Sequence, residues 1–204
     1  MPYVGANKIK ENSMNIQSVS QRRRMQGFTM IELIVVIVIL GILAAVALPR
    51  FTNIQRDARI AKLNAARGAV QAAAAMVHGT ALARGGVADT AACPAGGGTA
   101  NNAIGAAGTL CTENGIINMV NGYPAATIAG IVNASGIVSV MTPTAVQLAG
   151  DGYATNGAGP IDIRILGGTN PAQCFFRYTA AVANAAPAIG AVTPATVAGS
   201  TTGC

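Results

Sequence analysis

A run of 21 residues, from Phe28 to Leu48, contains only two clearly polar side chains, Thr29 and Glu32. As a helix with a rise of 1.5 Å per residue it would be about 31 Å long, enough to cross the ~30 Å hydrocarbon core of a bilayer. The competing interpretation is a secretory signal peptide, whose apolar core would be shorter and would end at a cleavage site of small residues. In this chain, residues 44–47 could serve as such a cleavage site. The length of the run favours a membrane-spanning segment over that alternative.

Charge is distributed unevenly along the 204 residues. Residues 1–84 contain eleven basic and three acidic residues, whereas residues 85–204 contain two basic and four acidic ones. The basic residues Arg22–Arg24 precede the apolar run, which is the layout of a membrane segment with a cytoplasmic basic flank. Because the excess positive charge is confined to residues 1–84 and flanks the apolar run, the net charge of +6 does not indicate a nucleic-acid partner. A charged share of 10% with 51% hydrophobic residues also excludes a solvated, disordered chain.

The segment after Pro49 is rich in helix formers and has no further proline before Gly85-Gly86. We therefore predict one helix from about residue 28 to residue 83, bent at Pro49. Its second half is expected to pack on the C-terminal part of the chain, whereas its first half needs lipid or other copies of itself. An apolar stripe follows helical spacing. It consists of Phe51, Ile54, Ala58, Ala61, Ala65, Ala69 and Ala72.

Three basic residues on another face of this second half-helix are Arg56, Arg59 and Lys62. The first expectation is a solvated helix face. Pairing with neighbouring subunits is the second, and DNA binding the third, because no aromatic residues are interleaved to stack on bases. His78 is expected to be an ordinary helix residue.

Residues 85–204 are rich in Gly, Ala, Thr, Asn and Pro, and we expect a small antiparallel sheet there. Residues 85–115 are predicted to form a long loop, and residues 125–133 have a helical pattern that ends near Gly136. Alternation of apolar and polar residues predicts strands. The expected strands cover residues 116–120, 161–165, 174–180 and, as an edge interrupted by Pro194, 189–197.

Four cysteines, Cys93, Cys111, Cys174 and Cys204, lie in the C-terminal half and form no CxxC pair or Cys/His cluster. Two disulfides in a compartment outside the cytoplasm are therefore more plausible than a zinc site, although three pairings are open. The sequence also shows no catalytic triad with a supporting motif, no paired-carboxylate motif and no nucleotide fingerprint. We thus predict no enzyme activity, no cofactor and no metal.

Glu32 is the residue that most needs an explanation. An ionised carboxylate within a membrane span is costly unless it has a partner, with insertion scales giving about +2.5 to +3.5 kcal/mol for Asp at a helix centre. If the chain is cut between Gly27 and Phe28, the new α-amine of Phe28 could pair with Glu32 of a neighbouring chain. A protonated Glu or one that reaches the interface is the simpler alternative.

The basic segment Arg22–Gly27, the sequence Phe28–Glu32 and the apolar run up to Pro49 together resemble the N-terminus of type IV pilins and related pseudopilins. The resemblance implies that a membrane prepilin peptidase cuts after Gly27 and that the amine of Phe28 is methylated. The resemblance also implies which residues act in filament assembly. Glu32 would contact the amine of an adjacent subunit. The helix would loosen between Gly41 and Pro49.

The implied fold is α+β, a lollipop-shaped type IV pilin fold with a long N-terminal helix and a small antiparallel sheet domain. The implied segments are a prepilin leader, a hydrophobic half-helix for the membrane and filament core, an amphipathic half-helix, and a disulfide-stapled β domain that begins with an αβ-loop. Their bounds are 1–27, 28–49, 50–84, 85–204 and, for the loop, 85–115. A leader of 27 residues is long, so Met14 is an alternative start.

A looser resemblance points to mannose-sensitive haemagglutinin pilins. It rests on Pro49–Phe51, Gly122–Pro124, residues 174–179 and the terminal Cys204. It implies a disulfide between Cys174 and Cys204, which leaves Cys93 and Cys111 to form the second disulfide.

The implied function is that of a major subunit of an extracellular pilus, used for adhesion, with motility as a further role. Its partners would be further copies of the chain, the prepilin peptidase, the pilus assembly machinery and the bacterial inner membrane, where the precursor resides. Three alternatives are a pseudopilin of type II secretion, a membrane-anchored enzyme or binding protein, and a DNA-uptake pilin.

Overall fold

The structure is a computed structural model, and it describes residues 27–157, 159–168, 170–193 and 204. The expected leader, with Met14, lies outside the described residues apart from Gly27. By its internal contacts the chain divides into two compact units, residues 1–46 and 47–204. Helix α1 (Met30–Arg84) has 55 residues and contributes to both units. The predicted long helix is thereby confirmed, and it ends at Gly85, which has the left-handed φ of +58°.

The described part of the first unit consists of residues 27–46, most of which belong to α1. The segment Met30–Leu48 has a mean hydropathy of 3.1, and none of it is buried against the rest of the described chain. By length and composition this segment can cross a membrane. Its apolar side chains therefore need a partner that the single chain does not supply.

In the second unit, α1 packs one face against the rest of the chain. The buried residues on this face follow helical spacing. They are Leu63, Ala66, Val70, Ala73, Ala74, Val77 and Ala81. The stripe expected from the sequence is a different one, and most of it is exposed, including Phe51, Ile54 and Ala58. Alanines occur all round this helix, so periodicity alone cannot tell which apolar face is packed.

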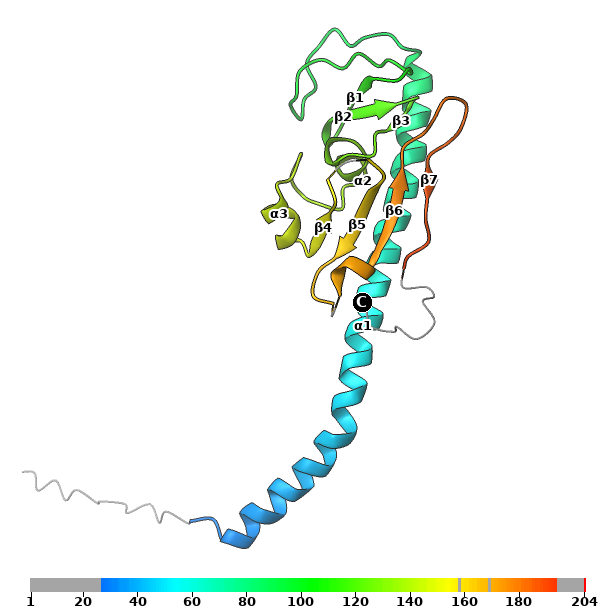
Figure 1. Ribbon diagram of the computed structural model, residues 1–204. Coiled ribbons are helices and arrows are strands. Elements are labelled where there is room, and N and C mark those ends of the chain that lie inside the picture. The colour runs from blue at the N-terminus through cyan, green and yellow to red at the C-terminus, as the bar shows by residue number, and fades with distance from the viewer. Residues whose placement is uncertain (1–26, 158, 169, 194–203) are drawn as a thin grey trace, which may run out of the picture. The chain divides into compact units, whose positions relative to one another are not determined.

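Two antiparallel sheets lie along this half of α1, where a single small sheet was expected (Figure 1). The first contains β1 (Gly108–Thr112), β2 (Gly115–Val120) and β3 (Tyr123–Pro124) in that order. Strand β1 therefore interrupts the loop expected over residues 85–115. Its register with β2 leaves a two-residue turn, Glu113-Asn114. Gly115 after this turn has a φ of +97°, which favours glycine.

The second sheet has the order β4-β5-β6-β7. Its strands are β4 (Tyr153–Thr155), β5 (Ile161–Ile165), β6 (Phe175–Thr179) and β7 (Ala188–Ile189). Strands β5 and β6 match the predicted strands within one residue at each end. The expected edge strand over 189–197 is reduced to β7 and an isolated bridge between Thr193 and Phe175, and residues 194–197 lie outside the described residues.

Four short helical segments complete the fold. They are the π-helix η1 (Ile128–Val132), α2 (Asn133–Ser135), α3 (Ala145–Gly150) and the 3-10 helix η2 (Pro171–Gln173). Segment α2 ends at Gly136 with a φ of +60°, as the sequence predicted. Helix α3 was not predicted from the sequence, although Thr144 and Gln147 form a capping box at its start.

The main core lies between the four-stranded sheet and α1. Alternate residues of β5 and β6 face inward, among them Ile161, Ile163, Phe176 and Tyr178, and they cluster with Leu63 of α1. The hydroxyl of Tyr178 donates a hydrogen bond of 2.7 Å to the carbonyl oxygen of Pro124 in the other sheet. This bond links the two sheets, and burial raises the pKa of the Tyr178 hydroxyl well above its usual range.

Replacing Leu63 with Ala should lower the free energy of unfolding by about 2–5 kcal/mol, because its side chain is fully buried and a cavity would remain. The matched control is Leu82→Ala on the same helix, where the exposed side chain should contribute less than about 0.5 kcal/mol. Denaturant unfolding of the full chain in detergent micelles measures both. Equal losses for the two variants would contradict the packing described.

Candidate functional site

The candidate assembly site is the N-terminal end of α1, where Gly27 and Phe28 are exposed and precede the helix. Thr29 caps the helix: its hydroxyl accepts a hydrogen bond of 3.3 Å from the main-chain nitrogen of Glu32. In return, the Glu32 carboxylate accepts bonds of 3.4 Å from the main-chain nitrogen and the hydroxyl of Thr29. Thr29 and Glu32 therefore form a capping box. This box was not predicted from the sequence, although T-x-x-E before an apolar run is its signature.

The capping box gives Glu32 a local role that needs no second chain. Its bonds to Thr29 are long, and charge-assisted bonds are usually shorter than 3 Å, so these bonds satisfy the carboxylate only weakly. Among the residues that the structure describes, no cation forms an ion pair with Glu32. The carboxylate thus remains available to a cation from another molecule.

Two further residues named for assembly lie within α1. A Cβ added at Gly41 would meet no atom within 4 Å, so packing within the described chain does not require glycine there. Pro49 lies within the continuous helix α1.

The basic residues of α1 hold the C-terminal domain on the helix. Arg59 Nη1 donates a bond of 2.6 Å to the main-chain oxygen of Cys204. Lys62 Nζ donates one of 2.7 Å to the main-chain oxygen of Asp151 and lies 4.4 Å from the centre of the Tyr153 ring. The expectation of a solvated face is therefore wrong for the half-buried Arg59, whereas Lys62 is exposed as expected but still bonds the domain. Their partners are main-chain oxygens, which a charge pattern in the sequence cannot reveal.

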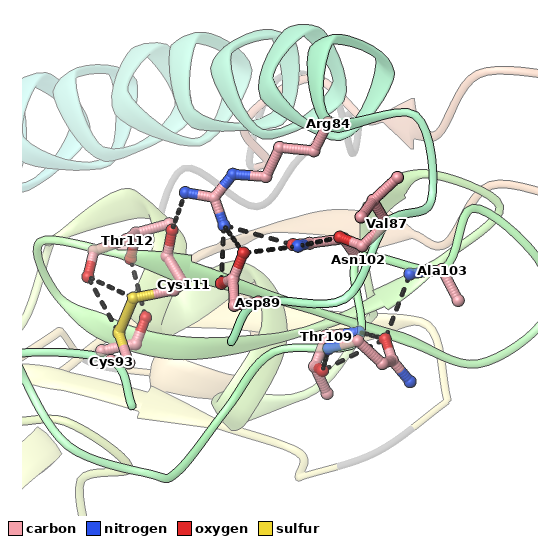
Figure 2. Close-up of polar contacts among 11 residues, drawn as sticks. Arg84, Val87, Asp89, Cys93, Asn102, Ala103, Thr109, Cys111 and Thr112 are labelled. Carbon is pink, nitrogen blue, oxygen red and sulfur yellow. Dashed lines mark hydrogen bonds and ion pairs between the residues drawn. A yellow bond between two sulfur atoms is a disulfide. The ribbon is translucent and has the colours of Figure 1, made fainter. Parts of the chain in front are cut away.

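Figure 2 shows the polar cluster that holds the loop after α1. Arg84 Nη1 lies 3.0 Å from Asp89 Oδ2 and donates a bond of 3.2 Å to Asn102 Oδ1, while Nη2 donates one of 3.3 Å to the main-chain oxygen of Cys111. Asn102 Nδ2 donates to Asp89 Oδ1 and to the oxygen of Val87, each at 2.7 Å. Asn102 is fully buried and its φ is +51°. The cluster supplies polar contacts that fasten to α1 a loop whose apolar residues are mostly alanines.

Two disulfides complete the restraint of the domain. Cys93 is bonded to Cys111, and Cys174 is bonded to Cys204, which are the pairings that the resemblance implied. The first joins the loop to β1, and the second joins the start of β6 to Cys204. Because Arg84 bonds Cys111 and Arg59 bonds Cys204, each bridge is also attached to α1.

The outer face of the four-stranded sheet has one buried acid. Asp162 of β5 accepts bonds of 2.6 and 3.1 Å from Arg177 of β6, and Arg164 Nη2 lies 3.4 Å away. Hydrogen bonding from the Arg177 guanidinium holds the pKa of the Asp162 carboxyl below its usual value. Its stabilising effect is therefore complete above the unfolded pKa and is lost as the pH falls through the lower, folded value.

The described residues show no arrangement typical of an enzyme. They contain no group of three or more His, Cys, Asp or Glu side chains that could hold a metal ion.

His78 stacks on Tyr123, with ring centres 3.9 Å apart, and its Nδ1 lies 3.1 Å from the oxygen of Gly122. Asn133, in an N-x-S sequence, is buried and its Oδ1 accepts a bond from the Thr142 nitrogen, so it is not placed as a glycan acceptor.

Replacing Arg84 with Met should loosen the loop after α1, because Asp89 and Asn102 lose their shared cation and Asn102 is buried. We expect the free energy of unfolding to fall by about 1–3 kcal/mol. Hydrogen exchange should speed up in residues 85–107. The control is Arg50→Met, since Arg50 is exposed and forms no ion pair with the described residues. Unchanged exchange in the Arg84 variant would show that the cluster does not restrain the loop.

Replacing Arg177 with Gln should reduce the acid sensitivity of the fold. In the unaltered chain, the free energy of unfolding should decline as the pH falls below about 4, the region where Asp titrates, because the Asp162 carboxyl must be protonated. Without Arg177 the folded pKa moves toward the unfolded value, and this part of the decline disappears. Denaturant titrations between pH 2 and 7 compare the two slopes, and parallel curves would refute the assignment.

Comparisons with known proteins agree on the N-terminal segment. Residues 22–48 match the family described as the prokaryotic N-terminal methylation motif. The chain is 49% identical over 53 residues to the type IV narrow pilus major component PilA5 of Thermus thermophilus, a match that covers 26% of this chain and 46% of that protein. It is 47% identical over 55 residues to the type II secretion system core protein G of Pseudomonas aeruginosa, covering 27% of this chain and 37% of that protein.

These matches cover less than half the length of either relative. No solved structure matches the chain significantly. The α+β arrangement of a long helix with small antiparallel sheets is nevertheless the one expected of the type IV pilin fold. The matched segment contains the expected cut site and Glu32, so the chain carries the N-terminal methylation motif of prokaryotic type IV pilins and pseudopilins.

Proposed function

We propose that the chain is a structural subunit, and specifically a major pilin, of an extracellular type IV pilus. The observation that carries the proposal is that the segment Met30–Leu48 lies within the matched methylation motif and is not covered by any other part of the described chain. A helix of this kind is stable in lipid before assembly and among identical helices after it. The precursor would thus reside in the inner membrane and pass into the filament.

The second half of α1 supports polymerisation through a helix face that its own domain leaves open. The exposed residues on this face are apolar or small, and they lie opposite the face that packs on the sheets. They include Phe51, Ile54, Ala58, Ala61, Ala65, Gly68, Ala72 and Leu82. A helix of a monomeric soluble domain would normally present charged and polar residues there. Small side chains allow neighbouring helices to approach closely.

In this proposal a prepilin peptidase cuts between Gly27 and Phe28, and the new amine of Phe28 is methylated. The amine stays positively charged after methylation and can pair with Glu32 of an adjacent subunit. Each charge then offsets the desolvation of the other in the apolar core of the filament. We assign Gly41 and Pro49 to the part of the helix that loosens on assembly, as in the resembling family.

The C-terminal domain, residues 85–204, would form the outer surface of the pilus and mediate adhesion. Its loop is held by Arg84 and by two disulfides, which suits a surface outside the cell. The looser resemblance to mannose-sensitive haemagglutinin pilins supports adhesion as the role. We infer no catalytic role, and the assembly partners are further copies of the chain and the type IV pilus machinery.

A second candidate is a pseudopilin of type II secretion, and the similarity to core protein G of Pseudomonas aeruginosa favours it. Both candidates require the same cut site and the same helix packing. They differ in where the polymer ends, because a pseudopilin would form a short periplasmic polymer. Fibres labelled outside the intact cell by an antibody against the C-terminal domain support the pilus, and labelling only after the outer membrane is opened supports the pseudopilin.

The role of the Glu32 charge can be separated from its capping role. Glu32→Gln keeps a capping box, since Gln serves at this position, but removes the negative charge. Thr29→Ala removes the cap and keeps the charge. We expect Glu32→Gln to abolish fibres in electron micrographs and Thr29→Ala to leave most of them. Abundant fibres in Glu32→Gln, or loss of fibres only in Thr29→Ala, would contradict the inter-subunit charge pair.

A further inference from the structure

A groove of about 300 Å³ lies between α1 and the tip of the β1–β2 hairpin. Met76, Val77 and Thr80 line its helix side, and residues 111–114 line its hairpin side. Met76 is 71% exposed, which is high for a large apolar side chain. The groove therefore offers an apolar surface next to a hairpin tip.

The hairpin side of the groove is held in place before any partner binds. Cys111 is tied by the disulfide to Cys93 and by the bond from Arg84 to its main-chain oxygen. Asn114 at the tip donates a bond of 3.3 Å to the main-chain oxygen of Asn133. A preformed wall reduces the ordering that binding would require, so this groove is suited to docking.

An acidic side chain lies at the rim of the groove. Glu113 occupies the hairpin tip and is exposed, and within the described part of the chain it forms no hydrogen bond or ion pair through its carboxylate. An apolar groove with an acidic rim is complementary to a large apolar side chain that has a cation beside it.

The chain itself contains such a segment near the start of the second unit. Phe51 and Ile54 are 64% and 62% exposed, and Arg50 beside them is exposed. Arg50 forms no ion pair with the residues that the structure describes. In contrast, Arg59 and Lys62 further along the helix are bonded within their own chain.

We propose that this groove receives Arg50 and Phe51 of a second copy of the chain, with the guanidinium of Arg50 next to the carboxylate of Glu113. The inference rests on the proposed filament. Phe51 and Val77 are 26 positions apart in α1, so parallel copies would be displaced by about 39 Å along the helix. The contact joins two different surfaces, and a head-to-tail contact of this kind continues into an open helical filament.

Cysteine cross-linking in intact fibres tests the contact directly. The pair Arg50→Cys with Glu113→Cys should give covalent dimers under mild oxidation, in at least ten times the amount given by the control. The control pairs Arg50→Cys with Asp151→Cys, because Asp151 is exposed in the same domain but does not line the groove. Fibres without dimers above the control would overturn the inferred contact and leave the pilus function standing. Absence of fibres in the unaltered chain would instead overturn the proposed function.

Charge exchange gives a second readout that does not depend on new cysteines. Arg50→Glu alone and Glu113→Lys alone should each lower the fibre yield, by a factor on the order of ten, because like charges then meet in the groove. The double variant should restore the yield to near that of the unaltered chain. The proposal would be overturned if the two single variants gave an unchanged fibre yield, or if the double variant gave a yield no higher than that of the single variants.

Discussion

The apolar half-helix of α1 imposes the constraint on which the rest of the molecule depends. Its side chains have no cover within the chain, and transferring them from water to an apolar surrounding is worth about 25 cal/mol per Å². The same segment contains one carboxylate, Glu32. A partner for this segment must therefore be apolar along its length, and in the proposed filament it also presents a cation to the Glu32 carboxylate near the N-terminal end. Lipid meets the first requirement, and a neighbouring chain with a free α-amine meets both.

The second half of α1 explains how the C-terminal domain can be carried on such a helix. One face packs with Leu63, Val70 and Val77 against the sheets. Arg59, Lys62 and Arg84 add bonds from the helix to main-chain oxygens of the domain. Because these contacts use one face and its edges, the opposite apolar face stays open. The domain is thus attached without blocking association of the helix with other copies.

Much of this fold could be predicted from the sequence, because its signals are local. The apolar run, the end of α1 at Gly85 and the alternation in β5 required no knowledge of distant residues. The packed face of α1 could not be predicted, since alanine is common on every side of it. The division into two sheets could not be predicted either, because β1 and β4 have only five and three residues, too few for a clear alternation of apolar and polar side chains. For the candidate site, the motif around Phe28 was visible, whereas the capping role of Thr29 was overlooked.

The central claim is that a freed and methylated amine on Phe28 allows these helices to leave the membrane as a polymer. Mass spectrometry of the N-terminal peptide from sheared surface fibres tests it most directly. The account predicts a peptide that begins at Phe28 and carries a methyl group on its α-amine. Fibres whose subunits retain residues before Phe28, or protein found only as uncut monomer in the cell envelope, would contradict it.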